Sequence, residues 1–248
     1  MNRTTIALDG LWDFVADLDP KYHAIHGGYQ RPDISRRHWQ KAPVPGVWQK
    51  LAERYAIFEG VCWYAREFDA PELPPGATAR LRFGGVNYLC RVYLNGQFIG
   101  AHEGGYTAFE LDCTAALQAG RNHIAVQVDN RATTIKWPPC LGYFNYGGIH
   151  RSVTLEICAG PVLSDLRLQA IPAGDNSELI AQGHVRDMRP GLIVRARAGA
   201  RSEGLSWEDW IDADGLFELR VPFFDTPAWS PDEPHLEPVT IELLDEVR

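Results

Sequence analysis

Hydrophobic and polar residues alternate with a period of two along most of the chain, in short segments. The clearest of these segments cover residues 80–83, 89–94 and 123–128. A period of two places alternate side chains on opposite faces of a strand. Gly, Pro, Asn or Asp ends most segments, which is typical of antiparallel sheets with tight turns. The pattern therefore predicts an all-β protein and rejects a single (β/α)8 barrel, which needs about eight helices between its strands.

Two local signals refine this prediction in the first part of the chain. Asn95 and Gly96 separate one strand from a further strand at 97–100, and both residues can take the positive φ of a two-residue hairpin turn. Residues 113–119 have a helical pattern with capping residues at both ends. We therefore expect a β-sandwich or jelly roll that contains a hairpin and one short helix.

The second part of the chain follows the turn signal Ala159-Gly160-Pro161. Its strand candidates are residues 166–170, 178–185, 193–198, 205–211, 216–221 and 239–244. We expect residues 212–215 to join two of these strands as a hairpin. About six short strands in under 90 residues are typical of an immunoglobulin-like β-sandwich. The predicted domains are thus a jelly-roll sandwich at residues 1–159 and an immunoglobulin-like sandwich at residues 160–248.

Composition excludes several classes of partner. The chain has 24 Lys+Arg against 32 Asp+Glu and a net charge of −8, so no basic surface is expected to bind nucleic acid. No apolar run reaches the roughly 18 residues of a membrane span. The five cysteines are irregularly spaced without a C-x-x-C pair, and the first residues lack the apolar stretch of a secretory signal. We therefore expect a reduced, cytoplasmic protein that binds neither nucleic acid nor membrane.

The chain has two incomplete metal-binding patterns. His23 and His26 form an H-x-x-H pair without a third ligand at a recognised spacing. The carboxylates around Gly215 lack the rest of a calcium loop, and a hairpin turn explains them. Nucleophile elbows, phosphate loops and zinc-protease motifs are absent from the sequence. We therefore predict no metal, no cofactor and no catalytic residue of its own.

One aromatic segment, residues 137–151, combines four aromatic side chains with an amide, an imidazole and a guanidinium. Aromatic faces suit the C–H surface of a sugar ring, and Asn and Arg can bond adjacent hydroxyl groups. The alternative is that the aromatic rings are buried and the glycines only turn the chain. Composition alone favours that second interpretation.

Two motifs resemble glycoside hydrolase family 2, above all its β-glucuronidases. They are HEGGYTAFELD at residues 102–112 and FNYGGIHRSV at residues 144–153. Supporting motifs lie in the same order as in that family, at residues 8–14, 44–48, 59–64, 93–96 and 228–236. The resemblance covers essentially the whole chain.

This resemblance implies a jelly-roll (galactose-binding-like) sugar-binding domain followed by an immunoglobulin-like domain. In the family, a third domain is a (β/α)8 barrel with two glutamates, an acid/base and a nucleophile. The motif at 229–234 belongs near the end of the second domain, so the chain is expected to stop about where the barrel should begin. The Asn-Glu dipeptide of the acid/base is absent from the sequence.

The resemblance also assigns roles to individual residues. It raises the aromatic segment to a candidate rim of a sugar site, at Trp137, Tyr143, Asn145, Tyr146 and His150. β-Glucuronidases place a sugar-binding aspartate where this sequence has Gly142, and a lost charge-assisted hydrogen bond costs about 1.5–3 kcal/mol. Glucuronide specificity is therefore not implied.

Other residues of the shared motifs are expected to be structural. We expect Trp12, Trp48, Trp63 and Trp229 to anchor hydrophobic cores. In the motif at 102–112, the glycines should form a tight turn and allow Tyr106 to pack.

The leading hypothesis is a non-catalytic, carbohydrate-recognising and scaffolding part of a β-glucuronidase-like family 2 enzyme. Its partners would be a glycoside and a catalytic barrel, either in a longer chain or as a separate subunit, and homo-oligomerisation stays open. The alternative is a stand-alone, lectin-like carbohydrate-binding protein. An enzyme with an unrelated site in a sandwich cleft is less favoured, because no activated pair of side chains is recognisable.

Overall fold

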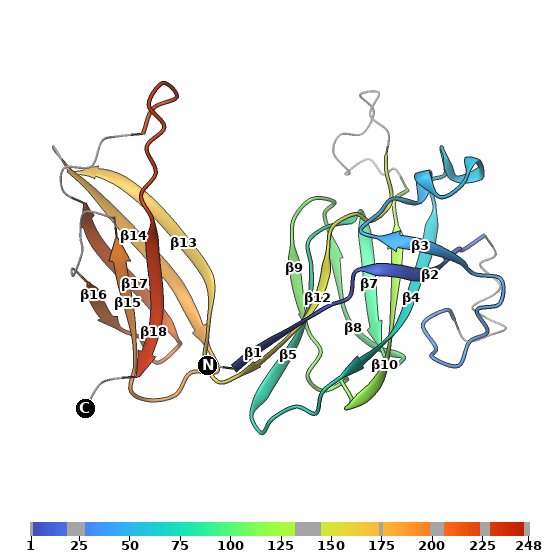
Figure 1. Cartoon of the computed structure of the whole chain (residues 1–248), viewed down its shortest axis with the longest axis horizontal. Helices are drawn as coiled ribbons and strands as arrows, with labels where there is room; N and C mark the ends of the chain where they lie inside the picture. The colour runs from blue at the N-terminus through green and yellow to red at the C-terminus, as the bar shows by residue number, and fades with distance from the viewer. Residues whose placement is uncertain are drawn as a thin grey trace. The chain divides into compact units, whose positions relative to one another are not determined.

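A computed structural model describes residues 2–18, 28–131, 145–173, 176–198, 206–223 and 229–245. The prediction of an all-β protein is confirmed, since these residues form antiparallel strands with two short 3₁₀ helices (Figure 1). The chain divides into two compact units, residues 2–159 and residues 160–248. Each unit is a β-sandwich with a core of its own. No helix in the described ranges is long and apolar enough to cross a membrane.

The first unit is a jelly roll of two main antiparallel sheets. The four-stranded sheet has the order β1 (Asn2–Ala7), β12 (Val153–Ala159), β5 (Ala77–Phe83) and β9 (Phe109–Asp112). The six-stranded sheet has the order β3 (Gln40–Val44), β2 (Gly10–Ala16), β4 (Val61–Ala70), β10 (Gly120–Asp129), β7 (Leu89–Leu94) and β8 (Gln97–Glu103). Two short strands, β6 (Val86–Asn87) and β11 (Gly148–Ile149), pair separately. Strand β1 pairs along its whole length with β12.

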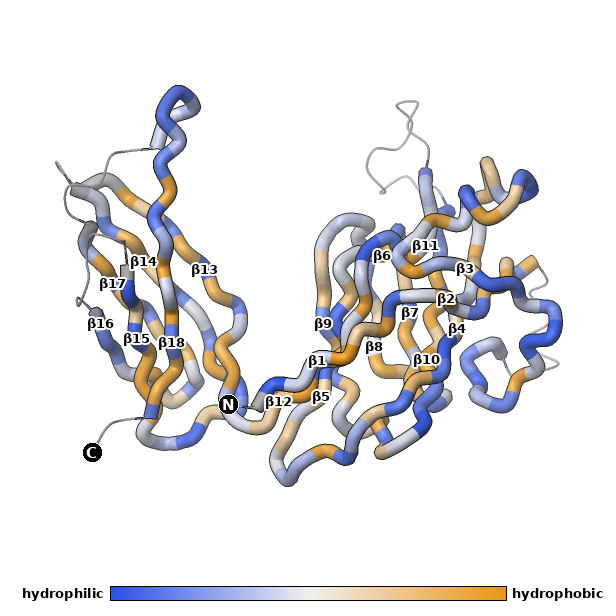
Figure 2. The backbone as a smooth tube through the Cα atoms, in the orientation of Figure 1, coloured by the Kyte–Doolittle hydropathy of each residue, from blue (hydrophilic) through white to orange (hydrophobic). Residues whose placement is uncertain are grey.

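Apolar residues on alternate strand positions fill the space between these two sheets (Figure 2). Trp12 and Trp48 are completely buried in this core, as predicted. The 3₁₀ helices η1 (Trp48–Lys50) and η2 (Glu53–Tyr55) lie in the connection between β3 and β4. Trp63 is also buried, but in a smaller cluster on the other face of the six-stranded sheet, together with Tyr29.

The local signals at residues 95–96 and 113–119 had different outcomes. Asn95 and Gly96 have φ values of 52° and 82°, which confirms the predicted hairpin between β7 and β8. The predicted helix at 113–119 is wrong. The segment makes one turn, in which the N–H groups of Ala116 and Leu117 both donate to the carbonyl oxygen of Cys113. Seven residues separate β9 from β10, and a helix this short is marginal unless tertiary packing supports it.

The second unit is an immunoglobulin-like sandwich of two three-stranded sheets. One sheet has the order β13 (Val162–Ala173), β14 (Asn176–Arg186) and β17 (Leu216–Phe223). The other has the order β16 (Trp207–Trp210), β15 (Leu192–Ala198) and β18 (Val239–Asp245). Its core includes Ala181, Val194, Ala196, Leu219 and Val221.

Two expectations for this unit are corrected. Residues 212–215 form a tight turn, in which Asp212 Oδ1 accepts hydrogen bonds from the N–H groups of Asp214 and Leu216. The turn does not make a hairpin, since β16 and β17 belong to different sheets and the turn carries the chain across the sandwich. Trp229 does not anchor the core. It lies in a segment without strand structure and is 59% exposed.

Candidate functional site

The described part of the FNYGGIHRSV motif, residues 145–153, begins at the end of the first sandwich where β10 terminates, and it contains β11 of the short pair β6–β11. Of the predicted rim residues, the structure describes Asn145, Tyr146 and His150. Trp137 and Tyr143 lie outside the described residues, and so does Gly142. The loop can therefore be built from residue 145 onward.

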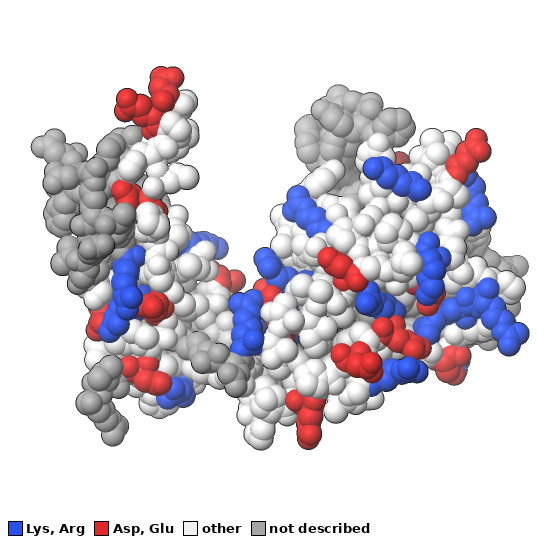
Figure 3. All heavy atoms as spheres, in the orientation of Figure 1, with Lys and Arg blue, Asp and Glu red and all other residues white. Residues whose placement is uncertain are grey.

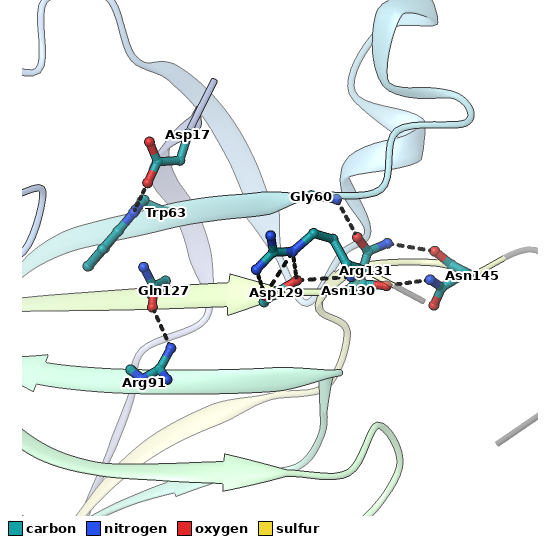
Figure 4. Close-up of polar contacts among 9 residues, drawn as sticks. All are labelled: Asp17, Gly60, Trp63, Arg91, Gln127, Asp129, Asn130, Arg131 and Asn145. Carbon is teal, nitrogen blue, oxygen red and sulfur yellow. Dashed lines mark hydrogen bonds and ion pairs between the residues drawn. The ribbon is translucent and has the colours of Figure 1, made fainter. Parts of the chain in front are cut away.

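Asn145 and Asn130 hold the beginning of this loop together (Figure 4). Asn130 is fully buried, and its Nδ2 donates to the carbonyl oxygen of Asn145 at 2.8 Å. Its Oδ1 accepts from the N–H of Gly60 at 2.9 Å. In return, Nδ2 of Asn145 donates to the carbonyl oxygen of Asn130. The amide that was predicted to line a sugar site thus also fixes the loop to β10.

Asn87 of β6 extends the same network to the next residue. Its Nδ2 donates to Oδ1 of Asn145 at 3.3 Å and to the carbonyl oxygen of Tyr146. Gly105 packs against the same amide, since a Cβ at Gly105 would lie 2.4 Å from Oδ1 of Asn87. The backbone of Tyr146 is therefore held in place, while the residue is 47% exposed.

The two glycines that follow Tyr146 allow a close approach to the core. A Cβ at Gly147 would lie 2.0 Å from Cζ2 of Trp48, and Gly148 has a φ of +135°. Gln49 secures this part of the loop, because its Oε1 accepts from the N–H of Gly147 at 3.0 Å. The Gly-Gly pair is thus required by packing against Trp48 and by backbone conformation.

His150 and Arg151 connect the loop to the other shared motif, at residues 102–112. Nε2 of His150 lies 2.6 Å from the carbonyl oxygen of Gly105, so Nε2 carries the proton and donates it. Nη1 of Arg151 donates to the carbonyl oxygen of Tyr106 at 2.8 Å. Two motifs that are far apart in the sequence therefore form one structural unit.

Tyr106 was expected to pack, and this expectation is wrong. The residue is 71% exposed, and the centre of its ring lies 5.7 Å from that of His150. His150 and Arg151 donate hydrogen bonds to the carbonyl oxygens of Gly105 and Tyr106, so the backbone that carries the exposed ring is held in place. Tyr106 is a site candidate that sequence reasoning missed. The motif at 102–112 pointed to this residue, but the exposure of its ring depends on tertiary contacts.

Burial and one ion pair shift the pKa values of two side chains near the described part of the loop. Burial raises the pKa of Tyr64 well above its ordinary value, and its hydroxyl contacts the backbone of Ile149. Arg131, the last described residue before the loop, bonds Asp129 at 2.6 Å, and this contact raises the pKa of Arg131. No group of three metal-binding side chains occurs in the described residues. On the face shown in Figure 3, the two signs of charge are interspersed.

Comparison with known proteins relates this sequence to a family of glycosyl hydrolases. Residues 50–158 match the model of the glycosyl hydrolases family 2 sugar binding domain. A β-galactosidase of Thermoanaerobacter pseudethanolicus is 31% identical over 207 residues, which are 75% of this chain and 26% of that protein. A β-glucuronidase of Homo sapiens is 27% identical over 66% of this chain and 30% of its own length. The chain thus spans less than a third of the length of these relatives.

Solved structures agree on the fold. The β-glucuronidase of Bifidobacterium dentium, complexed with coumarin-3-O-glucuronide, is 25% identical with a TM-score of 0.81, and the match covers 98% of this chain and 46% of that one. The β-glucuronidase of Ruminococcus gnavus in complex with D-glucuronic acid has a TM-score of 0.78 at 22% identity, over 99% of this chain and 44% of its own. Residues 50–158 thus match the sugar binding domain of the family 2 glycosyl hydrolases, and the described strands have the fold of solved β-glucuronidases.

Proposed function

We propose that the chain is the carbohydrate-recognising and scaffolding part of a β-glucuronidase-like family 2 glycosyl hydrolase. Its role is non-catalytic. It acts beside a (β/α)8 barrel, which belongs either to the same polypeptide or to a separate subunit, and it lends the loop around Tyr146 to the rim of the sugar site. The relatives divide between galactosidases and glucuronidases, so the substrate class is a β-linked hexose or hexuronic acid.

One observation carries this proposal: the loop has a fixed backbone and exposed aromatic side chains. Asn87 and Asn130 hold the backbone at residues 145 and 146, and His150 holds the carbonyl oxygen of Gly105. Tyr106 and Tyr146 nevertheless present their rings to solvent. A preorganised aromatic surface binds a sugar without the entropic cost of ordering a loop.

The proposal also accounts for the missing catalytic chemistry. In the described residues the polar side chains of the loop bond to other parts of the protein, and a hydrolase of this type needs two carboxylates about 5–5.5 Å apart for a retaining reaction. The described part of the loop, residues 145–151, contains no carboxylate. In this proposal, the barrel supplies the carboxylates that hydrolyse the glycoside. We also propose a cytoplasmic location, supported by the buried free thiols of Cys62, Cys90 and Cys113.

The test uses the 248-residue chain and 4-nitrophenyl β-D-glucuronide and β-D-galactoside. We expect no turnover of either substrate, and we expect calorimetry to detect weak binding of the corresponding sugars. Tyr106→Ala and Tyr146→Ala should each weaken this binding about tenfold, whereas Leu236→Ala, an exposed change in the second unit, should not. Turnover that is lost on substitution of one of the chain's own carboxylates would overturn the proposal.

The same experiment separates the stand-alone binding protein from the scaffolding part. Binding of an oligosaccharide by the isolated chain with a Kd in the low micromolar range would favour a lectin-like function. Binding in the millimolar range is the result expected when a barrel supplies most of the sugar contacts. Homo-oligomerisation stays a prediction, and sedimentation of the same sample measures it.

A further inference from the structure

The six-stranded sheet has an outer face, on the side away from the main core, that is only partly covered. Tyr29, from the segment preceding β3, packs on Trp63 with ring centres 5.7 Å apart. Trp63 lies 5.7 Å from Tyr93, and Tyr93 lies 5.5 Å from Phe98. Tyr29 and Trp63 are buried, whereas Phe98 is 58% exposed. A row of aromatic rings therefore runs out of a core and ends in solvent.

A polar pair lies beside the exposed end of this row. Arg91 of β7 is directly opposite Gln127 of β10, and Nη1 of Arg91 donates to Oε1 of Gln127 at 3.1 Å (Figure 4). Tyr93 follows Arg91 two positions later on the same strand, so both side chains project from the same face, about 7 Å apart along the strand. Phe98 is directly opposite Tyr93 on β8.

The residues directly opposite Arg91 on its two neighbouring strands are Gln127 and Ala101, and neither is acidic. Several other arginines on strands face a carboxylate on the neighbouring strand and pair with it, as in Arg80–Asp112, Arg82–Glu110 and Arg195–Glu208, although Arg167 faces Gln182. Arg91 faces a neutral amide instead, and within the described ranges it forms no ion pair. Its exposed guanidinium therefore keeps donors that can bind a carboxylate from outside the protein.

We propose that Arg91, Tyr93, Phe98 and Gln127 form a second carbohydrate-binding site, for a sugar that carries a carboxylate. The aromatic rings contact the C–H face of a hexuronate ring, the guanidinium binds its carboxylate, and the amide of Gln127 bonds a hydroxyl group. Regular strands build this site, whereas the site around Tyr146 is built by loops. It is independent of the function proposed for that loop.

The test is a titration of the ¹⁵N-labelled 248-residue chain with an α-1,4-linked trigalacturonate, followed by NMR. Its carboxyl-reduced counterpart, a neutral galactose trisaccharide, is the second probe. We expect trigalacturonate to shift the amide signals of β7, β8 and β10 and to bind at least tenfold more tightly than the neutral probe. Phe98→Ala should weaken binding of both probes at least tenfold. Arg91→Gln should abolish the preference for the acidic probe, whereas Arg121→Gln, an exposed change on the same sheet, should leave it intact.

Three results would overturn the proposal. One is the absence of shifts on β7, β8 and β10 with either probe. Another is binding that perturbs only residues 105–106 and 145–150 and that Phe98→Ala leaves unchanged, which would assign the sugar to the loop. The third is sedimentation showing that the chain self-associates and that Phe98→Ala abolishes this, which would make the outer face a contact between copies. Both substituted side chains are exposed, so thermal unfolding should confirm that each variant folds.

Discussion

His150 donates a hydrogen bond to the carbonyl oxygen of Gly105, although 45 positions separate the two residues in the sequence. This bond joins the two motifs that carry the family resemblance. It explains why the motifs occur together, because the imidazole of one satisfies the backbone of the other. Arg151 adds a second link, because its Nη1 donates to the carbonyl oxygen of Tyr106.

Replacing His150 should therefore loosen the 104–106 turn. His150→Ala leaves the carbonyl oxygen of Gly105 without its donor, and we expect unfolding free energy to fall by about 1–2 kcal/mol. His150→Gln can still donate and should lose less. Urea unfolding measures both variants, and equal stability of His150→Ala and the wild type would contradict the role assigned to this bond.

Gly147→Ala should destabilise the first unit more strongly. The added Cβ would lie 2.0 Å from Trp48, which is completely buried, so the ring or the loop must shift. Overpacking of this kind costs about 1–3 kcal/mol or more. Gly160→Ala is the matched control, because its added Cβ meets nothing within 4 Å and only its positive φ of 103° is strained. A thermal shift for Gly147→Ala no larger than for this control would show that the loop is not clamped against Trp48.

The outcomes of individual local predictions show which features of the fold can be predicted from the sequence. The Asn95-Gly96 hairpin followed from the two residues alone, because the positive φ they require is a local property. The prediction of a helix at 113–119 was wrong because seven residues between two strands are too few for a helix that propensity alone would stabilise. Exposure of Tyr106 and Trp229 could not be predicted from sequence, since it depends on which distant segments cover a ring. The hydrogen bonds among Asn87, Asn130 and Asn145 could not be predicted either, because an isolated asparagine in a sequence is typical of an ordinary turn.

Asn130→Ala should uncouple the loop from the sheet. The side chain is fully buried and bonds both Gly60 and Asn145, so truncation leaves the N–H of Gly60 without its acceptor and the carbonyl oxygen of Asn145 with only the weaker bond from Gln49. We expect a loss of about 2–4 kcal/mol. Hydrogen exchange of the Gly60 amide is the specific readout, and unchanged protection in the variant would contradict this account.

His123 should make the first unit less stable as pH falls. Burial, with the nearby charge of Arg36, lowers its pKa to about 4, against the opposing effects of Glu67 and Asp13. The unfolded chain therefore binds a proton near pH 6.5 that the native chain refuses until about pH 4. Stability should fall across that window, by on the order of 2–3 kcal/mol.

His123→Leu tests this prediction. Neither ring nitrogen of His123 has a hydrogen-bond partner in the described residues, so the substitution removes no bond there. Urea unfolding at pH 4.5 and pH 7 should show a smaller difference for the variant than for the wild type. An unchanged difference would assign the pH dependence to the carboxylates alone.

The buried thiols should be unreactive in the folded protein. Burial raises the pKa of Cys90 and of Cys113 to about 12, and the thiolate is the nucleophilic form. Titration with a disulfide reagent at pH 8 should modify Cys158, which is partly exposed, well before these two. Peptide mass mapping identifies the sites, and rapid native labelling of Cys90 would contradict the burial.

Strand β1 pairs with β12, from Asn2 opposite Ala159 to Ala7 opposite Thr154. The first strand of this unit therefore has its neighbour in the last strand of the same unit. The four-stranded sheet cannot form completely until translation has passed residue 159, and until then β1 has no strand partner along either edge. During synthesis, β1 can therefore join its sheet only after β12, which is made more than 140 residues later, has left the ribosome.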